Sequence, residues 1–218
     1  MATGCISTAQ IPKIPGLEGF KGEVYHTGNW PHKEIDFSSK RIAVVGVGSS
    51  GIQSIPVLAE QARHLTVFQR TPNYSIPSQN EPMTADYEKL WKSDYASRRE
   101  EMRYTPHGSL KDLNDKSALS ANEEERQLTY QKRWEIGGAG YLGAFNDLLT
   151  NIESNDTASE FVREKIREIV KDPVIAEKLS PKTYPIGTKR ICIDSGYFET
   201  FNSCLLYTSD AADESSSG

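Results

Sequence analysis

Three glycines in the stretch GVGSSG have the spacing of a phosphate-binding turn. Gly46, Gly48 and Gly51 follow the order G-x-G-x-x-G, with Ser49 and Ser50 between the last two. In such a turn the first glycine permits a sharp bend, the second lets the backbone approach a pyrophosphate, and the third allows the next helix to pack closely. The phosphates then lie at the positive end of that helix. The spacing predicts a dinucleotide site if a strand precedes it and a helix follows.

The flanking sequence predicts that strand and that helix. Residues 41–45, RIAVV, form a short apolar run typical of a strand buried on both faces of a parallel sheet. Residues 51–63 have the apolar spacing of a helix, and residues 64–69, HLTVFQ, predict a second strand. The residues expected on the buried face of the helix are Ile52, Ile55, Leu58 and Ala59. The complete unit favours a Rossmann-type α/β fold, and the alternative is a structural glycine turn that binds nothing.

The residue that follows the second strand indicates which dinucleotide binds. An NAD site has Asp or Glu there, where it binds the ribose 2′-hydroxyl, whereas Arg accommodates the 2′-phosphate of NADP. Here Arg70 occupies that position, and Thr71 adds a hydroxyl beside it. Because a guanidinium can bind a phosphate through two parallel hydrogen bonds, we expect NADP. The alternative for Arg70 is an ordinary solvated surface arginine.

The bulk composition argues against several classes of protein. The 218 residues carry a net charge of −5, with no basic excess to neutralise the phosphates of a nucleic acid. No apolar run approaches the roughly 20 residues that span a bilayer. The first ten residues also lack the features of a secretory signal, so we expect a cytoplasmic protein without nucleic-acid or membrane partners. Because Cys5, Cys192 and Cys204 are odd in number and lack CxxC spacing, we expect free thiols and no metal site.

Residues 20–31, FKGEVYHTGNWP, resemble a family fingerprint. They match the pattern FxGxxxHTxxWP of the Baeyer–Villiger monooxygenases at every fixed position. Those positions are Phe20, Gly22, His26, Thr27, Trp30 and Pro31. The related heteroatom-oxidising flavin monooxygenases carry Ser and Tyr in place of Thr27 and Trp30. The chain therefore more closely resembles the ketone-oxidising branch.

The resemblance implies a segment of a flavoprotein with two dinucleotide-binding domains and two cofactors, FAD and NADP. In the family, NADPH reduces the flavin, and one oxygen atom of O2 is inserted next to a ketone carbonyl to give an ester or lactone. The implied reactants are thus a small-molecule ketone and O2. The implied division assigns residues 1–36 to the end of the FAD domain and a linker, residues 37–82 and 181–203 to the Rossmann-type NADP domain, and residues 83–180 to a helical insertion. Which ketone reacts, with what regiochemistry, and in what oligomeric state are not indicated by the sequence.

The resemblance also implies roles for three further residues. In the family's equivalent of GTKR, a lysine approaches the 2′-phosphate of NADP and an arginine approaches the flavin. These residues are Lys189 and Arg190. A permanently charged guanidinium stabilises a negatively charged oxygenated flavin without donating a proton to it. His26 is expected near the domain junction, where it influences the coupling of cofactor movement to chemistry. In isolation, a Lys-Arg pair and a lone histidine are most simply solvated surface residues.

Residues 83–180 have a charged, helix-forming sequence. Apolar side chains at near-helical spacing predict buried stripes on two helices. The first stripe consists of Tyr87, Leu90, Trp91, Tyr95 and Met102, and the second of Phe161, Val162, Ile166, Ile169 and Val170. Thr84 is expected to cap the first helix, and the charged run 123–126 is expected to be a solvated face. The glycines of residues 136–147 mark either close helix packing, which we favour, or a flexible active-site loop.

Both ends of the sequence are expected to be truncated relative to the complete domains of the family. MATGCIS resembles the ATG element that closes the family's FAD domain, so the FAD-binding glycine loop is expected upstream, and Met1 need not be the natural start. Residues 204–218 include CLLYTSDAADE, which resembles a translated sequencing adaptor, and are expected to be a non-native tail. Two alternatives to the Baeyer–Villiger reading stay open. They are a heteroatom-oxidising flavin monooxygenase and a catalytically inactive NADP-binding module.

Overall fold

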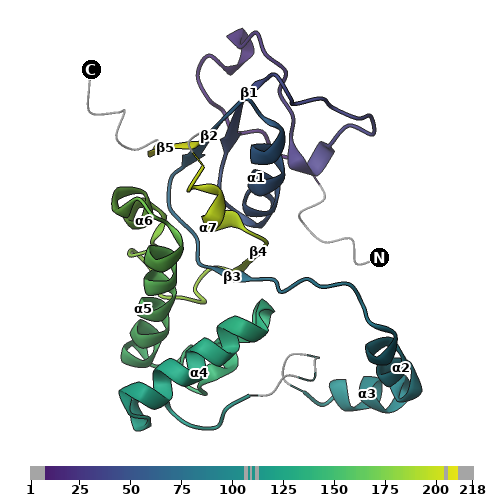
Figure 1. Ribbon diagram of the computed structural model, residues 1–218, viewed down its shortest axis with the longest axis vertical. Coiled ribbons are helices and arrows are strands. Elements are labelled where there is room, and N and C mark those ends of the chain that lie inside the picture. The colour runs from purple at the N-terminus through teal and green to yellow at the C-terminus, as the bar shows by residue number, and fades with distance from the viewer. Residues whose placement is uncertain (1–7, 106–107, 109, 111–112, 204–205, 211–218) are drawn as a thin grey trace.

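The computed structural model describes residues 8–105, 108, 110 and 113–203, and the backbone of residues 206–210. The MATGCIS stretch, Cys5 and Cys204 lie outside these residues. In chain order the strands and α-helices are β1 (Arg41–Val45), α1 (Ser49–Gln61), β2 (His64–Gln69), β3 (Ser75–Pro77), α2 (Ala85–Ser93), α3 (Tyr95–Met102), α4 (Glu123–Ile136), α5 (Ile152–Ile169), α6 (Pro173–Leu179), β4 (Cys192–Asp194), α7 (Tyr197–Thr200) and β5 (Leu206–Asp210) (Figure 1). The short 3-10 helices are η1 (Leu17–Gly19), η2 (Thr27–Asn29), η3 (Ala118–Ser120) and η4 (Gly138–Ala144).

The strand–turn–helix–strand unit expected from the glycine spacing is present. β1 and β2 pair in parallel, with Val45 opposite Phe68, and α1 connects them. The residues expected on the buried face of α1 are fully buried or pack against the same core: Ile52, Ile55, Leu58 and Ala59. Because the strands are parallel, their carboxyl ends meet at one edge of the sheet. The glycine turn and the residues that follow β2 are therefore neighbours.

β1 is more exposed than its sequence predicts. Its residues alternate between exposed and partly exposed positions, and Val45 has 64% of its surface exposed. The sheet has the order β1-β2-β5, so β1 is an edge strand within the described part of the chain. A strand is buried on both faces, without alternating buried and exposed residues, only when other elements cover both faces of the sheet. The prediction that residues 41–45 are buried on both faces is wrong for the described residues.

β5 adds a third strand to the sheet that contains β1 and β2. Leu206–Asp210 pairs in parallel with β2, from Leu65 opposite Leu206 to Gln69 opposite Asp210. The physical reason is that a sheet edge presents unpaired N–H and C=O groups, and a following extended segment can satisfy them. The order β5-β2-β1 corresponds to the 3-2-1 half of a doubly wound sheet. The expectation that residues 204–218 are a non-native tail stays a prediction.

A second, two-stranded sheet joins segments that are distant in sequence. β3 and β4 pair in parallel with Ser75 opposite Cys192, and the Cys192 N–H donates to the Tyr74 carbonyl at 3.0 Å. The buried Ser75 hydroxyl donates to the carboxylate of Asp194. β4 and α7 also pack against α1. Residues 181–203 thus lie beside the β1–α1–β2 unit, and the proposed domain boundaries themselves stay a prediction.

An aromatic cluster holds the helical part together. Its rings lie with centroids 5.4–6.3 Å apart and belong to Tyr130, Trp134, Tyr141, Phe145 and Phe161. Tyr141 of η4 is fully buried, and its hydroxyl donates to the Ala158 carbonyl at 2.9 Å. The stretch 136–147 is therefore a packed junction, and the packing interpretation holds at Gly137, where a Cβ would lie 2.5 Å from the Pro77 carbonyl oxygen, but not at Gly138 and Gly140, which face open space.

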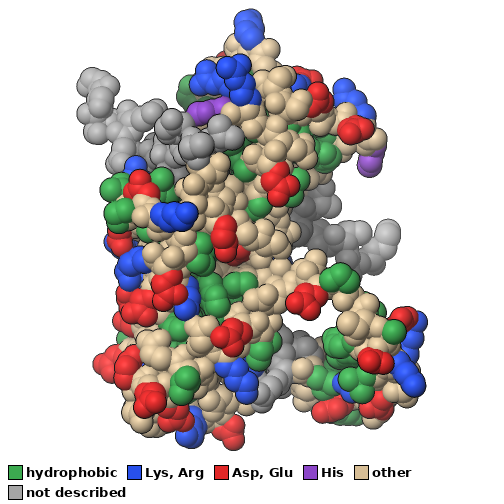
Figure 2. Space-filling view, viewed as in Figure 1, with side chains coloured by type: hydrophobic (Ala, Val, Ile, Leu, Met, Phe, Trp, Pro, Cys, Tyr) green, Lys and Arg blue, Asp and Glu red, His purple; other side chains and the backbone are tan. Residues whose placement is uncertain are grey.

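The two predicted apolar stripes have different outcomes. The stripe of α5 is core, with Phe161, Val162, Ile166 and Val170 buried and Ile169 packed against them. The stripe of α2 and α3 is not buried. More than half of the surface of Tyr87, Leu90 and Tyr95 is exposed, and the prediction of a core face is wrong there. The reason is position: the hairpin stands apart from the other helices, with hydrophobic side chains at its surface (Figures 1 and 2).

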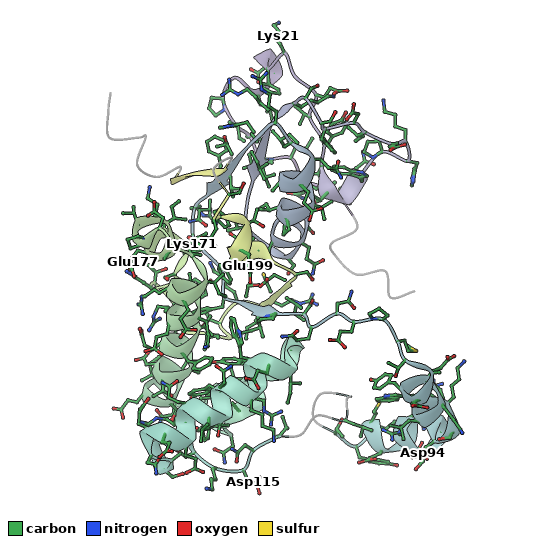
Figure 3. All side chains as sticks on the ribbon, in the orientation of Figure 1. Lys21, Asp94, Asp115, Lys171, Glu177 and Glu199 are labelled. Carbon is green, nitrogen blue, oxygen red and sulfur yellow. The ribbon has the colours of Figure 1, made fainter. Side chains whose placement is uncertain are left out.

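Local interactions account for the α2–α3 hairpin. Thr84 caps α2 as expected, because its hydroxyl accepts from the Tyr87 N–H at 3.2 Å. The Arg98 guanidinium lies 4.7 Å from the centroid of the Trp91 ring. It also forms an ion pair with Asp94 at 3.7 Å, and Asp94 is labelled in Figure 3. Short-range contacts of this kind stabilise a helix pair by only a few tenths of a kcal/mol each. The hairpin is therefore expected to be the least stable part of the described chain.

The charged run 123–126 is solvated except at its last residue. Arg126 is partly buried, and its Nη1 donates to the Ala121 carbonyl at 2.7 Å and to the Ala118 carbonyl at 3.3 Å. The guanidinium thereby ties α4 to η3, so the prediction of a purely solvated face is wrong at Arg126. Among the described helices, none is long and apolar enough to span a membrane.

The difference between the two stripes can be tested by truncation. We expect Ile166→Ala to lower the free energy of unfolding by about 2–5 kcal/mol, because it opens a cavity in the core. We expect Leu90→Ala, the matched change on the exposed stripe, to stay within about 0.5 kcal/mol of the unmodified chain. Urea denaturation followed by circular dichroism measures both. A loss of several kcal/mol for Leu90→Ala would contradict the exposed position of the hairpin.

Candidate functional site

The glycine turn has the geometry that its spacing predicts. Gly46 has φ 99°, a left-handed conformation that favours glycine, and its N–H donates to the Phe68 carbonyl at 2.8 Å. A Cβ at Gly51 would lie 2.3 Å from the Gly46 carbonyl oxygen, so the first turn of α1 rests directly on the backbone of the turn. A Cβ at Gly48 would meet nothing within 4 Å. Gly46 and Gly51 are thus required by the fold, whereas Gly48 leaves the backbone open to a ligand.

The N-terminus of α1 has the partial positive charge and the free N–H groups that an anion can bind. Its first turn contains Ser49, Ser50 and Gly51 and no acidic residue, and Gly48 provides no side-chain cap. The N–H groups of a first helical turn have no partner within the helix, and they carry the positive end of the helix dipole. The Ser49 hydroxyl lies 3.5 Å from the Cys192 sulfur, which links this turn to β4. The arrangement favours a phosphate at the start of α1.

A cleft of about 330 Å³ opens beside this turn. It is lined by the turn, by the end of β2 and by one residue from the segment before β4: Val45, Gly46, Val47, Gly48, Phe68, Gln69, Arg70, Thr71, Asn73 and Lys189. None of the lining residues is acidic. Arg70 and Lys189 are exposed and make no ion pair within the described chain. Two unpaired cations therefore meet beside a helix N-terminus.

In a larger cleft elsewhere, the cations are paired with carboxylates. It encloses about 660 Å³ next to α5 and residues 181–185. Its cations are already neutralised, since Arg163 pairs with Glu160 at 2.8 Å, and Arg167 pairs with Glu160 at 2.8 Å and Glu177 at 3.1 Å. Glu177, labelled in Figure 3, lies on α6 beside this surface. Size alone would favour this cleft, but the unpaired charges favour the smaller one as an anion site.

Three residues in or behind the wall of the smaller cleft were not foreseen from the sequence. Asn73 donates its amide N–H to the Val47 carbonyl at 2.8 Å, and it accepts from the Tyr184 hydroxyl at 2.9 Å. Tyr184 also supports Lys189, whose Nζ lies 4.2 Å from the ring centroid. Burial raises the pKa of Tyr184 to about 12, so its hydroxyl keeps its proton near neutral pH. Asparagine after a proline is a common turn residue, which is the only sequence signal for Asn73, and no local signal pairs Tyr184 with its partners.

Gln69 is the third unforeseen residue. It is 5% exposed, and its amide N–H donates to the Lys178 carbonyl at 2.8 Å. Its Oε1 has no hydrogen-bond partner within the described chain. Buried polar atoms are seldom left unpaired, so this acceptor is an exception among the described residues.

The structure does not bring His26 or Arg190 into this cleft. The His26 Nδ1 accepts from the Gly28 N–H at 3.0 Å and caps η2, within the fingerprint loop. Near it, Tyr25, Trp30 and Phe37 form an aromatic group with centroids 5.7–6.5 Å apart. Arg190 is exposed next to Lys189 and outside the cleft lining. The expected role of Arg190 at the flavin and that of His26 at the domain junction therefore stay predictions.

No group of three or more His, Cys, Asp or Glu side chains suited to a metal ion occurs among the described residues. Cys192 is a free, buried thiol. It lies behind the glycine turn, where its sulfur contacts Ser49. Its surroundings are those of a packed core residue.

Comparison with known proteins agrees with the geometry. Residues 1–82 match the family model described as flavin-binding monooxygenase-like. Cyclohexanone 1,2-monooxygenase from Acinetobacter sp is 41% identical over 207 residues, 92% of this chain and 37% of the relative. A Baeyer–Villiger monooxygenase from Pseudooceanicola batsensis is 36% identical, over 91% of this chain and 36% of the relative. This chain is a homologue of the Baeyer–Villiger monooxygenases.

The similarity extends to a solved structure and to one relative that is named for a different activity. The crystal structure of OTEMO in complex with FAD and NADP has a TM-score of 0.93 and 37% identity, over 97% of this chain and 41% of that one. Phenazine N-monooxygenase PhzNO1 from Lysobacter antibioticus is 37% identical, over 92% of this chain and 37% of the relative. The α/β fold of this Baeyer–Villiger monooxygenase homologue is thus that of the matched segment of OTEMO. The chain spans less than half of the length of each of these relatives.

Two glycine substitutions separate the structural and ligand-facing roles in this homologue. We expect Gly51→Ala to cost about 1–3 kcal/mol, because its Cβ would collide with the fixed Gly46 carbonyl. We expect Gly48→Ala to leave stability within about 0.5 kcal/mol, since its φ of −77° suits alanine and its Cβ meets open space. Thermal denaturation measures both. Equal destabilisation by the two variants would contradict the observed packing.

Proposed function

We propose that the cleft between the glycine turn and Lys189 binds NADP(H). The observation that carries this proposal is the convergence of Arg70 and Lys189 at the start of α1, both without a carboxylate partner among the described residues. The 2′-phosphate is the group that distinguishes NADP from NAD, and a guanidinium and an ammonium together neutralise it. The pyrophosphate would lie against Gly48, whose missing side chain leaves room for it. Ser49, Ser50 and Thr71 supply further donors at the edge of the same site.

For the whole protein we propose an NADPH- and FAD-dependent Baeyer–Villiger oxygenation. Similarity to cyclohexanone 1,2-monooxygenase and to OTEMO in complex with FAD and NADP supports it. The balanced reaction consumes NADPH, a proton, O2 and a ketone, and yields NADP+, water and an ester or lactone. When bound, FAD would accept the hydride and activate O2. This chain's residues would hold the nicotinamide cofactor, and Arg190 would add a permanent positive charge towards the flavin.

Two other functions have specific support. The similarity to phenazine N-monooxygenase favours oxidation of a heteroatom, for which a nitrogen or sulfur lone pair replaces the ketone carbonyl. Product analysis with a cyclic ketone and with a nitrogen heteroaromatic separates these reactions. The other candidate is NADP binding without redox activity, which the two cations in the lining of the cleft support by themselves. Purified chain that binds NADP but no flavin would favour it. The cytoplasmic location stays a prediction.

The cofactor assignment predicts an asymmetric loss on substitution of Arg70. We expect Arg70→Ala to weaken NADPH binding by about 10- to 100-fold, the value of the charged hydrogen bonds it removes, and NADH binding by less than about 2-fold. Arg70→Lys should lie between, because it keeps the charge and loses the fork geometry. Isothermal titration calorimetry at fixed ionic strength measures each constant. Equal losses for both cofactors would remove the assignment.

The proposed role of Arg190 at the flavin predicts that its removal uncouples NADPH oxidation from ester formation. In a full-length enzyme that contains this segment, we expect Arg190→Ala to abolish ester formation while NADPH oxidation continues and releases hydrogen peroxide. Arg190→Lys should be uncoupled as well, because an ammonium can give up its proton where a guanidinium cannot. Product chromatography and a peroxide assay measure the two outcomes. Ester formation that persists in Arg190→Ala would refute the role.

A further inference from the structure

Tyr184 lies behind the lining of the glycine-turn cleft, where it contacts two lining residues, Asn73 and Lys189. Its hydroxyl donates to the Pro72 carbonyl at 2.7 Å and lies 2.9 Å from Asn73 Oδ1, so the two acceptors share one proton. Asn73 in turn donates to Val47 at 2.8 Å. The hydroxyl is therefore connected, through one side chain, to the backbone of the glycine turn.

The ring of Tyr184 makes a separate contact. The Lys189 Nζ lies 4.2 Å from the ring centroid, within the range of a cation–π interaction. The ring itself is fixed from behind, because it packs edge-on against the buried Tyr74 with centroids 5.6 Å apart. The Tyr74 hydroxyl donates to the Pro181 carbonyl at 3.2 Å. The platform beneath the ammonium is thus more rigid than the lysine that rests on it.

The position of the ammonium needs such support. Lysine has a long flexible side chain with about 2 kcal/mol of rotamer entropy, and Lys189 is exposed without a carboxylate to hold it. An aromatic face attracts the ammonium and still leaves its N–H groups free on the opposite side. Those groups can then meet a phosphate that Arg70 approaches from the end of β2.

We propose that Tyr184 is a positioning residue for cofactor specificity. Its ring holds Lys189 where a 2′-phosphate binds and so contributes to the preference for NADP over NAD. Its hydroxyl braces the glycine turn through Asn73 and so contributes equally to both cofactors. The proposal rests on the proposed NADP function. It assigns one measurable effect to the ring of Tyr184 and another to its hydroxyl.

The test measures the dissociation constants of NADP+ and NAD+ for the whole chain by isothermal titration calorimetry. Tyr184→Phe keeps the ring and removes the hydroxyl, and we expect both constants to rise by the same factor, about 2- to 10-fold. Tyr184→Leu removes the ring as well. We expect its ratio of NADP+ to NAD+ affinity to fall by a further factor of about 2–5, from the lost cation–π contact.

The same change in a Lys189→Met background isolates the contact. If the ring acts through Lys189, Tyr184→Leu no longer alters the affinity ratio when the ammonium is absent. Partial unfolding of a variant lowers binding of both cofactors alike, so the ratio still reports on specificity. Thermal denaturation records the folded fraction of each variant.

Two kinds of failure can be told apart. A wild-type chain that shows no preference for NADP+ overturns the cofactor assignment, and this inference with it. A wild-type chain that prefers NADP+, with the same preference in Tyr184→Leu, overturns only the role of Tyr184. The same holds if the ratio falls equally with and without Lys189.

Discussion

The cleft depends on the pairing of β3 with β4. These strands belong to segments 117 residues apart, as the Ser75 hydroxyl and the Cys192 carbonyl illustrate. β3 follows directly on the residues that leave β2, and β4 follows directly on Lys189 and Arg190. Because the two strands are parallel, the segments before them emerge at the same edge. Arg70 to Asn73 and Lys189 can therefore share a cleft, although nothing local in the chain brings them together.

The helical part determines whether that pairing can form. Closing a chain segment of this length costs conformational entropy, and the cost grows only slowly with length. The aromatic cluster of α4, η4 and α5 folds most of the intervening chain into a compact body, so the effective loop is much shorter than the sequence separation. Asn155 connects this body to the cleft segment, since its Nδ2 donates to the Ile186 carbonyl at 2.8 Å and its Oδ1 accepts from the Ile186 N–H at 3.0 Å. The helices therefore act on the site by placing residues 184–190.

Sequence alone predicted the parts of the site that depend on residues close together in the chain. The glycine turn, α1 and Arg70 follow from spacing within about thirty residues, where propensity and periodicity are informative. Lys189 was found only through the family resemblance, because no local pattern separates it from a solvated lysine. Asn73 and Tyr184 were missed, since their hydrogen bond joins residues 111 apart. The exposed stripe of α2 and α3 was predicted as core for a related reason: periodicity shows that a helix has an apolar face and not whether anything covers it.

The local charge of the cleft matters more than the charge of the protein. The chain has a net charge of −5, yet the cleft lining in the described part of the chain includes two cations and no anion. Elsewhere, as at Arg163 and Arg167, carboxylates stand within 4 Å of the cations and cancel them. At ordinary ionic strength, interactions between exposed charges are largely screened beyond about 8–10 Å, so distant acids do little to weaken the pair Arg70 and Lys189 for a ligand in contact with them. Selectivity for a 2′-phosphate then depends on where the two cations are held. Arg70 is placed by the end of a strand, whereas Lys189 depends on the side chain beneath it.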